Sequence, residues 1–166
     1  MKQEDLHSKF ISLLREYERI IYKICYLYAD NEADRQDLYQ EIVIQVWKGY
    51  QNFRGEAKFS TWLYQVAINT AIAGFRKEKK SPLTYSADGS LPEMADINYG
   101  EKETEQLEQL YAAISRLNDI EKAVVMLYLD DNSYEEMENI MGIPNGALRV
   151  KMTRIKEKLR QLTKNN

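Results

Sequence analysis

The chain has 166 residues, of which 44% are hydrophobic and 30% are charged, and its formal net charge is −3. This composition suits one domain or two small ones with real cores, and no apolar run approaches the roughly 18 residues that a membrane span requires. One cysteine and one histidine give neither an internal disulfide nor a zinc or Cys–His catalytic set. The acidic N-terminus lacks the apolar segment of a signal peptide. We expect a cytoplasmic protein without catalytic residues, metal or cofactor.

The charge is unevenly distributed along the chain. Residues 145–166 carry seven Lys or Arg and one Glu, whereas residues 81–109 carry seven Asp or Glu and one Lys. The distribution of charge says more about partners than its sum does. The basic end can bind DNA while the acidic middle meets a different partner.

The first half of the chain predicts three helices. Apolar residues recur at intervals of three and four from about Leu6 to Tyr28, and a second helix runs from about Glu32 to Tyr50 after a cap at Asp30 or Asn31. Acidic residues in the first turns of the second helix complement the helix dipole, which is the structural explanation for Asp34 and Asp37. These helices and the next one should form one bundle.

The stretch from Phe53 to Lys80 combines a Gly-containing loop with a helix that ends in cations, and Ser60 is the predicted N-cap of that helix. Aromatic and polar groups beside positive charge suit unstacked nucleic-acid bases. A core helix with a solvated basic end is the alternative. Ser81-Pro82 should end the helix, because the residue before a proline avoids the helical region.

The second half predicts a helix-turn-helix. Capping boxes are expected at Asn118 and Ser133, Gly142 is a predicted left-handed C-cap, and Asn145 is the predicted cap of a last, basic helix. Two helices joined by such a turn, the second one basic, are typical of DNA-binding proteins, although a helical hairpin with a solvated basic face is the alternative. The apolar stripe of the last helix leaves four residues free to reach base edges, namely Arg149, Val150, Thr153 and Arg154. Four cations are better placed for phosphates: Lys151, Lys156, Lys158 and Arg160.

The predicted fold class is therefore all-α. We expect a bundle of three or four helices over residues 1–80, a flexible acidic linker over 81–104, and a helix-turn-helix domain over 105–166.

Two separate stretches resemble one family, the bacterial extracytoplasmic-function (ECF) sigma factors of RNA polymerase, which belong to the sigma-70 superfamily. The first stretch comprises Asp34-Arg35-Gln36-Asp37-Leu38-Tyr39-Gln40-Glu41, Trp47, residues 53–64 and Asn69-Thr70-Ala71. It is similar to the second conserved region of the family. The second stretch, Ser133-Tyr134-Glu135-Glu136-Met137 through Gly142-Ile143-Pro144-Asn145-Gly146 with the basic helix, is similar to the fourth region.

The resemblance implies partners and site residues. It implies binding to the beta-prime clamp helices and beta flap of core RNA polymerase, and to promoter DNA. The residues that match the clamp-binding surface are Asp34, Asp37, Leu38, Gln40 and Glu41. An anti-sigma protein, often membrane-bound in the family, is a further implied partner, without insertion of this chain into the membrane.

The resemblance also divides promoter recognition between the two domains. The loop Phe53 to Phe59, including Arg54, and Asn69 match the pocket that captures a base flipped out of the minus-ten element. Phosphates beside it would be held by Arg76, Lys77, Lys79 and Lys80. Arg149, Val150, Thr153 and Arg154 match the positions that read the minus-thirty-five element. The linker is similar to the family segment that threads toward the polymerase active centre and RNA exit path.

The chain departs from the family pattern at three positions. Ala147 and Leu148 stand where Thr and Val are usual, and Val150 stands where a small polar residue is usual. Valine cannot hydrogen-bond a base, though it can contact a thymine methyl.

An alternative sigma factor that directs polymerase to specific promoters is the expected function. The competing hypotheses are a sigma-like decoy that binds an anti-sigma protein and a stand-alone helix-turn-helix regulator. An enzyme is disfavoured, because the sequence shows no metal set, no Gly-rich phosphate loop and no nucleophile–base pair.

Overall fold

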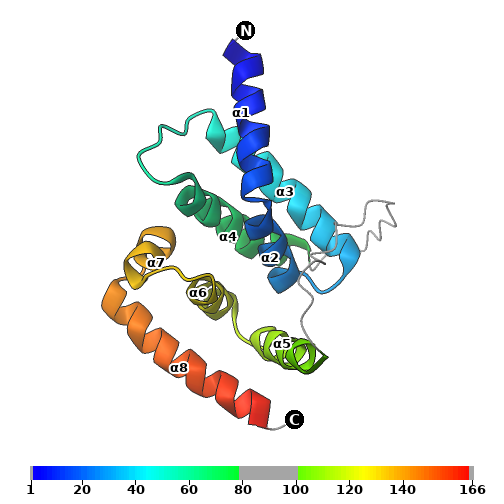
Figure 1. Ribbon diagram of the computed structural model, residues 1–166, viewed down its shortest axis with the longest axis vertical. Helices are drawn as coiled ribbons and strands as arrows, with labels where there is room; N and C mark the ends of the chain where they lie inside the picture. The colour runs from blue at the N-terminus through cyan, green and yellow to red at the C-terminus, as the bar shows by residue number, and fades with distance from the viewer. Residues whose placement is uncertain (1, 79–100, 165–166) are drawn as a thin grey trace. The chain divides into compact units, whose positions relative to one another are not determined.

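The computed structural model describes residues 2–78 and 101–164 (Figure 1). Within these residues every regular element is an α-helix, as the all-α prediction requires. The chain divides into two compact units, Met1–Met94 and Ala95–Asn166. Most of the predicted linker, from 81 to 100, lies outside the described residues.

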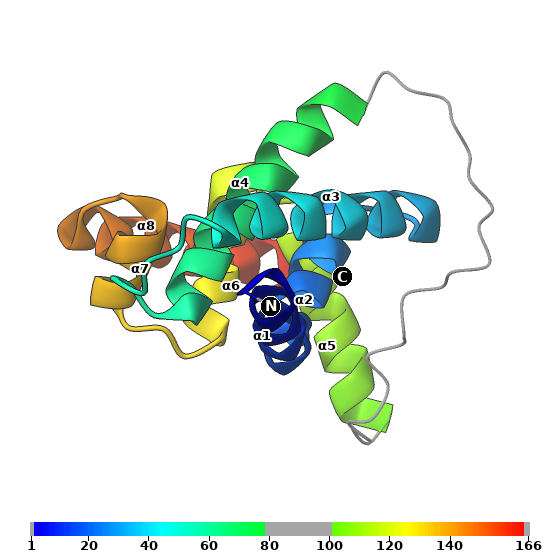
Figure 2. The ribbon, with the colours of Figure 1, turned by 90° about the horizontal axis from the view of Figure 1, so that it is seen from above.

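Among its described residues, 2–78, the first unit contains four helices, which pack together as a bundle (Figure 2). They are α1 (Lys2–Glu16), α2 (Glu18–Tyr28), α3 (Glu32–Tyr50) and α4 (Phe59–Glu78). Helices α2, α3 and α4 contact one another pairwise, and α1 contacts α2. Fully buried aliphatic side chains from all three central helices meet in the core; they include Ile21, Ile24, Ile42, Val46, Leu63 and Ala67.

The predicted helix from Leu6 to Tyr28 is wrong in one respect, because it is two helices that meet at Tyr17. The backbone there leaves the helical region, with φ −109° and ψ 15°. The Tyr17 ring packs on Phe59, with ring centroids 5.4 Å apart. This contact joins residues far apart in the sequence, so apolar periodicity alone could not reveal the break.

A shared carboxylate joins α2 to α3. The hydroxyls of Tyr22 and Tyr39 both donate to Oε1 of Glu18, at 2.5 Å and 3.1 Å. The two rings are stacked with centroids 5.2 Å apart. Burial, followed by the bond to Glu18, raises the pKa of Tyr22 well above its ordinary value. The network ties the second and third helices together through a charge-assisted contact.

The helix starts of the first unit differ in how they are capped. Asn31 caps α3, since its side chain accepts a hydrogen bond from the Asp34 N–H at 2.9 Å, which confirms one of the two predicted caps. The predicted cap at Ser60 is wrong, because α4 already begins at Phe59 and the Trp62 N–H donates to the Lys58 carbonyl. Ser60 therefore lies inside the first turn.

Within residues 101–164, the second unit packs three helices against a long fourth one. They are α5 (Glu101–Ile114), α6 (Asp119–Leu129) and α7 (Tyr134–Met141), each in contact with α8 (Asn145–Lys164). Leu148, Met152 and Ile155 of α8 are buried, as the apolar stripe predicts. Because α5 begins at Glu101, residues 101–104 are helical and the predicted linker ends too late.

The turns of the second unit follow most of the predicted signals. Asn118 and Glu121 form a reciprocal capping box. The Ser133 hydroxyl accepts from the Glu136 N–H at 3.1 Å, and Gly142 adopts a left-handed conformation with φ 71°. The predicted cap at Asn145 is wrong: α8 begins at that residue, and the Leu148 N–H donates to the carbonyl of Pro144.

Candidate nucleic-acid and protein interfaces

The loop between α3 and α4 is held at its start by backbone hydrogen bonds. The N–H groups of Asn52 and Phe53 donate to the carbonyls of Gly49 and Tyr50, each at 3.0 Å. Further along, Gly55 has φ 74°, a conformation that L-residues rarely adopt. The loop therefore leaves α3 through a tight turn and changes direction at a glycine.

Aromatic rings anchor this loop to the bundle. The Phe53 ring lies 4.9 Å from Trp62 and 6.1 Å from Phe59, and Phe59 lies 5.8 Å from Trp62, between ring centroids. Tyr50 and Tyr17 extend the cluster by contacting Phe59. The three central rings are half-buried, so they hold the loop in place while part of their surface stays open.

The polar residues predicted beside these rings are exposed. The Arg54 side chain lies on the loop surface, and Asn69 is exposed on α4. Arg76 and Lys77 lie in the final turns of α4. Lys79 and Lys80 lie outside the described residues.

The five residues matched to polymerase binding all lie on α3, but on different sides of it. Gln40 and Glu41 are exposed, and Asp37 is half-exposed. Asp34 is also half-exposed, and its carboxylate accepts from the Asn31 amide at 2.9 Å, so it supports the start of the helix. Leu38 is only 6% exposed and belongs to the core, where it fixes the helix rather than forming part of an outer surface.

On α8, the residues matched to base reading form one exposed face. Arg149, Thr153 and Arg154 are exposed, Val150 is 50% exposed, and Lys151 beside them is half-exposed. The Thr153 hydroxyl donates to the Arg149 carbonyl at 3.1 Å, which leaves its oxygen able to accept. The face thus offers guanidinium donors, a hydroxyl oxygen and an apolar surface.

Arg149 is held by two residues that sequence reasoning missed. Its Nε donates to Oδ1 of Asn145 at 2.8 Å, and its Cζ lies 4.5 Å from the centroid of the Tyr134 ring. The i, i+4 spacing of Asn145 and Arg149 is a signal that could have indicated the first contact. The second joins α7 to α8 and depends on how these helices pack.

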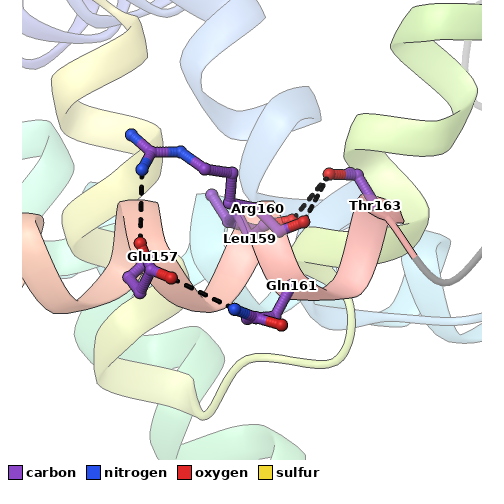
Figure 3. Close-up of polar contacts among 5 residues, drawn as sticks. All are labelled: Glu157, Leu159, Arg160, Gln161 and Thr163. Atoms are coloured by element: carbon purple, nitrogen blue, oxygen red, sulfur yellow. Dashed lines mark hydrogen bonds and ion pairs between the residues drawn. The ribbon is translucent and has the colours of Figure 1, made fainter.

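Three of the cations predicted to bind phosphates already contact other residues of the second unit. Lys156 lies 4.6 Å from the Tyr128 ring centroid and donates to its hydroxyl, and Lys158 donates to Glu121 at 3.0 Å. Arg160 pairs with Glu157 at 3.3 Å. Figure 3 shows Glu157 between Arg160 and Gln161, and the Thr163 hydroxyl bonded to the carbonyls of Leu159 and Arg160.

The part of the chain that the structure describes contains no group of three or more His, Cys, Asp or Glu side chains that could hold a metal ion. None of its helices meets the length and hydropathy that crossing a bilayer demands.

Two family models match the chain, one in each unit. The model of sigma-70 region 2 covers residues 13–81, which include α2 to α4 and the aromatic loop. The model of sigma-70 region 4 covers residues 107–159, which include α6, α7 and the exposed face of α8. An all-helical protein with these two regions in this order has the organisation of a transcription initiation factor.

Curated relatives narrow this class. The ECF RNA polymerase sigma factor SigW of Bacillus subtilis (strain 168) is 32% identical, over 92% of this chain and 87% of the relative. The ECF RNA polymerase sigma-E factor of Escherichia coli (strain K12) is 28% identical, over 93% of this chain and 86% of the relative. The chain belongs to the ECF sigma factors of the sigma-70 family.

Solved structures share the fold. The sigma factor RpoE from Bartonella quintana, in complex with the anti-sigma factor NepR, matches with a TM-score of 0.72 at 19% identity over 94% of this chain and 97% of that one. CnrH, in complex with the cytosolic domain of CnrY, matches with a TM-score of 0.69 at 16% identity over 96% and 90%.

Proposed function

We propose that this sigma factor brings core RNA polymerase to promoters by contacting DNA at two places, one in each unit. The aromatic loop of the first unit captures an unstacked base of the minus-ten element, and the exposed face of α8 reads the minus-thirty-five element. The single observation that carries the proposal is that each unit of this chain exposes one face suited to a different form of DNA. The first unit exposes aromatic rings beside polar groups, and the second exposes guanidinium groups on one side of α8.

The first face suits single-stranded DNA. The half-buried rings of Phe53 and Phe59 offer stacking surface, and exposed Arg54 and Asn69 offer donors and acceptors for a base edge and its phosphate. Extruding a base from a duplex costs a few kcal/mol, and a loop already held by packed rings can bind that base without a further loss of conformational freedom. Base capture then couples recognition to strand opening. Arg76, Lys77, Lys79 and Lys80 would hold neighbouring phosphates.

The second face suits duplex DNA. Arg149 and Arg154 present guanidinium groups of the kind that read guanine in the major groove, and Val150 can contact a thymine methyl. The Thr153 hydroxyl donates to the Arg149 carbonyl, so its oxygen can accept from a base. Lys151 is the cation of this stretch best placed for a phosphate, because Lys156, Lys158 and Arg160 are engaged within the domain.

Protein partners complete the proposal. Asp37, Gln40 and Glu41 on the outside of α3, with Asp34, would meet the beta-prime clamp helices, and the second unit would meet the beta flap. Two of the structural neighbours are complexes with an anti-sigma factor or a cytosolic domain of another protein. We extend anti-sigma regulation to this chain, and we place its action in the cytoplasm as a binding protein without an active site.

The first experiment tests recruitment. Purified protein is added to bacterial core polymerase, and run-off transcription is measured on a library of genomic fragments from the host. We expect initiation at one class of promoter. Absence of both core binding and transcription would overturn the proposal, and a footprint on DNA without polymerase would support a stand-alone regulator instead.

The second experiment tests the division of labour. Asn69→Ala should impair strand opening, measured by permanganate reactivity of unpaired thymines. Arg149→Ala should weaken use of the upstream element by about 1–3 kcal/mol if it pairs with a guanine. Lys164→Ala removes a cation from the other end of α8 and is the matched control. Identical defects in the first two variants would contradict a two-site mechanism.

A further inference from the structure

We propose that Tyr134 and Asn145 determine base preference in the upstream element by holding the guanidinium of Arg149 in one orientation. Neither residue needs to contact DNA for this role, so both are positioning residues. The inference rests on the proposed base-reading role of Arg149 and extends it to the residues that set the specificity of that contact.

Two contacts of different kind fix the guanidinium. Asn145 lies one turn before Arg149 on α8 and accepts from its Nε–H at 2.8 Å. Tyr134, the first residue of α7, places its ring 4.5 Å from Cζ. A hydrogen bond at one edge and an aromatic ring on one face leave little freedom of rotation for a planar group.

The arrangement leaves the two terminal nitrogens of Arg149 available. Among the described residues, the recorded partners of its guanidinium are Asn145 and Tyr134. Asn145 occupies Nε, so the fork formed by the two terminal nitrogens remains for an end-on contact. The O6 and N7 atoms of guanine accept such a fork in a bidentate manner. The geometry therefore favours a G·C pair at the position that Arg149 reaches.

Preorganisation explains why this affects specificity. A long side chain that is mobile in the free protein loses conformational freedom when it binds, and it can adapt to several bases. A side chain already held in one orientation loses less freedom on binding and fits fewer alternatives. Loosening Arg149 should therefore reduce discrimination more than it reduces general attraction to DNA.

The same domain supplies a natural comparison at Tyr128. The Lys156 ammonium lies 4.6 Å from the Tyr128 ring, so this pair is also a cation on an aromatic face. An ammonium is a compact point charge without a planar fork, so its orientation carries no base information. Lys156→Gln removes this charge and leaves in place the Tyr128 ring, which lies 6.3 Å from the Tyr134 ring, so it should change overall binding without changing the preference at any base pair.

The test uses the full-length chain in complex with core polymerase. Promoter fragments randomised across the upstream element are selected for binding, and the base preference at each position is obtained by sequencing. The variants are Arg149→Ala, Tyr134→Leu, Asn145→Ala, Tyr134→Phe and Lys156→Gln. Thermal unfolding of each variant is followed by circular dichroism.

We expect Arg149→Ala to abolish the preference at one base pair. Tyr134→Leu and Asn145→Ala should each lower the preference at that same base pair by roughly 3- to 10-fold, the size of one cation–π or side-chain contact. Tyr134→Phe keeps the ring and should keep the preference. Adding Tyr134→Leu to Arg149→Ala should cause no further loss of preference.

Three other results would each overturn a different statement. If Arg149→Ala changes no position, the proposed base-reading role of Arg149 is wrong. If Arg149→Ala abolishes a preference that Tyr134→Leu and Asn145→Ala both retain, the positioning role is wrong and the proposed function stands. A fall in thermal stability of Tyr134→Leu with unchanged base preference would show that its ring only joins α7 to α8. Asn145→Ala tests orientation separately, because it removes no core contact.

Discussion

Gly49 on α3 lies so close to the indole of Trp62 on α4 that a methyl group at its Cα would come within 2.8 Å of Cζ2. Trp62 in turn contacts the rings of Phe53 and Phe59. The absence of a side chain at one helix position thus lets a second helix approach, and that approach places the ring on which the aromatic loop rests.

We predict that Gly49→Ala destabilises the first unit although alanine favours helices. The gain in helix propensity is about 1 kcal/mol, whereas overpacking a well-packed site costs about 1–3 kcal/mol. Displacing Trp62 should also disturb the loop and slow strand opening. Urea unfolding gives the free energy, and permanganate reactivity in the complex with polymerase reports opening.

Gly74 provides the matched control, because a methyl group there would meet no atom of the described residues within 4 Å outside the backbone of its own helix. Gly74→Ala should leave stability equal or raised. Replacing Trp62 by Phe in the Gly49→Ala background should recover part of the lost function, since the smaller ring leaves room. Equal behaviour of the two glycine variants would show that the contact with Trp62 is without consequence.

Tyr39→Phe should destabilise the first unit by about 1–3 kcal/mol, because it removes a hydrogen bond to the Glu18 carboxylate between α3 and α2. The measurement is urea unfolding monitored by circular dichroism. Tyr26→Phe is the control: that ring is 43% exposed and keeps its contact with Arg35, so its loss of a hydroxyl should be nearly neutral. The prediction is wrong if the two variants lose equal stability.

Alkaline pH should destabilise the first unit for a related reason. Burial raises the pKa values of Tyr22 and Tyr39, and it raises that of the Cys25 thiol to about 12, against an opposing effect of Arg35. Groups whose pKa is raised by folding contribute stability that is present below their unfolded values, about 9 for Cys and 10 for Tyr, and is lost as pH rises through the folded values.

Tyrosinate absorbance near 295 nm and thiol labelling check this expectation. At pH 8 the native Cys25 thiol, which is 0% exposed, should react slowly with a thiol reagent, and it should react at once in denaturant. Above about pH 10, labelling should accelerate together with loss of helix. Rapid labelling of the native protein at pH 8 would contradict a closed core.

Glu121→Gln should cost the second unit about 1–2 kcal/mol, because one carboxylate accepts from both the Asn118 N–H and the Lys158 ammonium. Burial alone would raise the pKa of Glu121, but these two donors outweigh it and lower the pKa. The stabilisation is therefore complete above about pH 4.5, the unfolded value, and is lost as pH falls through the lower folded value.

Glu157→Gln is the control for this prediction. Its ion pair with Arg160 is exposed on both sides, with 57% and 67% of the side chains accessible, so we expect a change of at most a few tenths of a kcal/mol. Unfolding at pH 7 and at pH 3.5 separates the two variants. The difference between Glu121→Gln and the unmodified chain should shrink at the lower pH.

Much of this fold follows from local signals in the sequence. Asn118 marks a helix start because its side chain accepts a hydrogen bond from a free backbone N–H group. Gly142 marks a helix end because a residue without a side chain readily adopts the left-handed conformation found there. The break at Tyr17 and the early start of α4 at Phe59 were not predictable in this way, since both accompany ring packing between distant segments. Element boundaries are set partly by such tertiary contacts.

The site shows the same division. Helical periodicity predicts that Arg149, Val150, Thr153 and Arg154 share one face of α8, and all four are exposed. The family resemblance matched Leu38 to the polymerase-binding surface, although its side chain is buried. The contact of Tyr134 with Arg149 depends on the crossing of α7 and α8, which no spacing within one helix encodes.

Lys156, Lys158 and Arg160 all contact residues of their own unit, and this affects how promoter binding depends on salt concentration. Each phosphate that a protein neutralises releases condensed counterions and steepens the dependence of affinity on ionic strength. Lys158 and Arg160 already pair with carboxylates, so part of the charge at this end of the recognition helix is balanced before DNA binds and fewer counterions are released there. Occupancy of the upstream element should then change only gently when a cell takes up or loses salt.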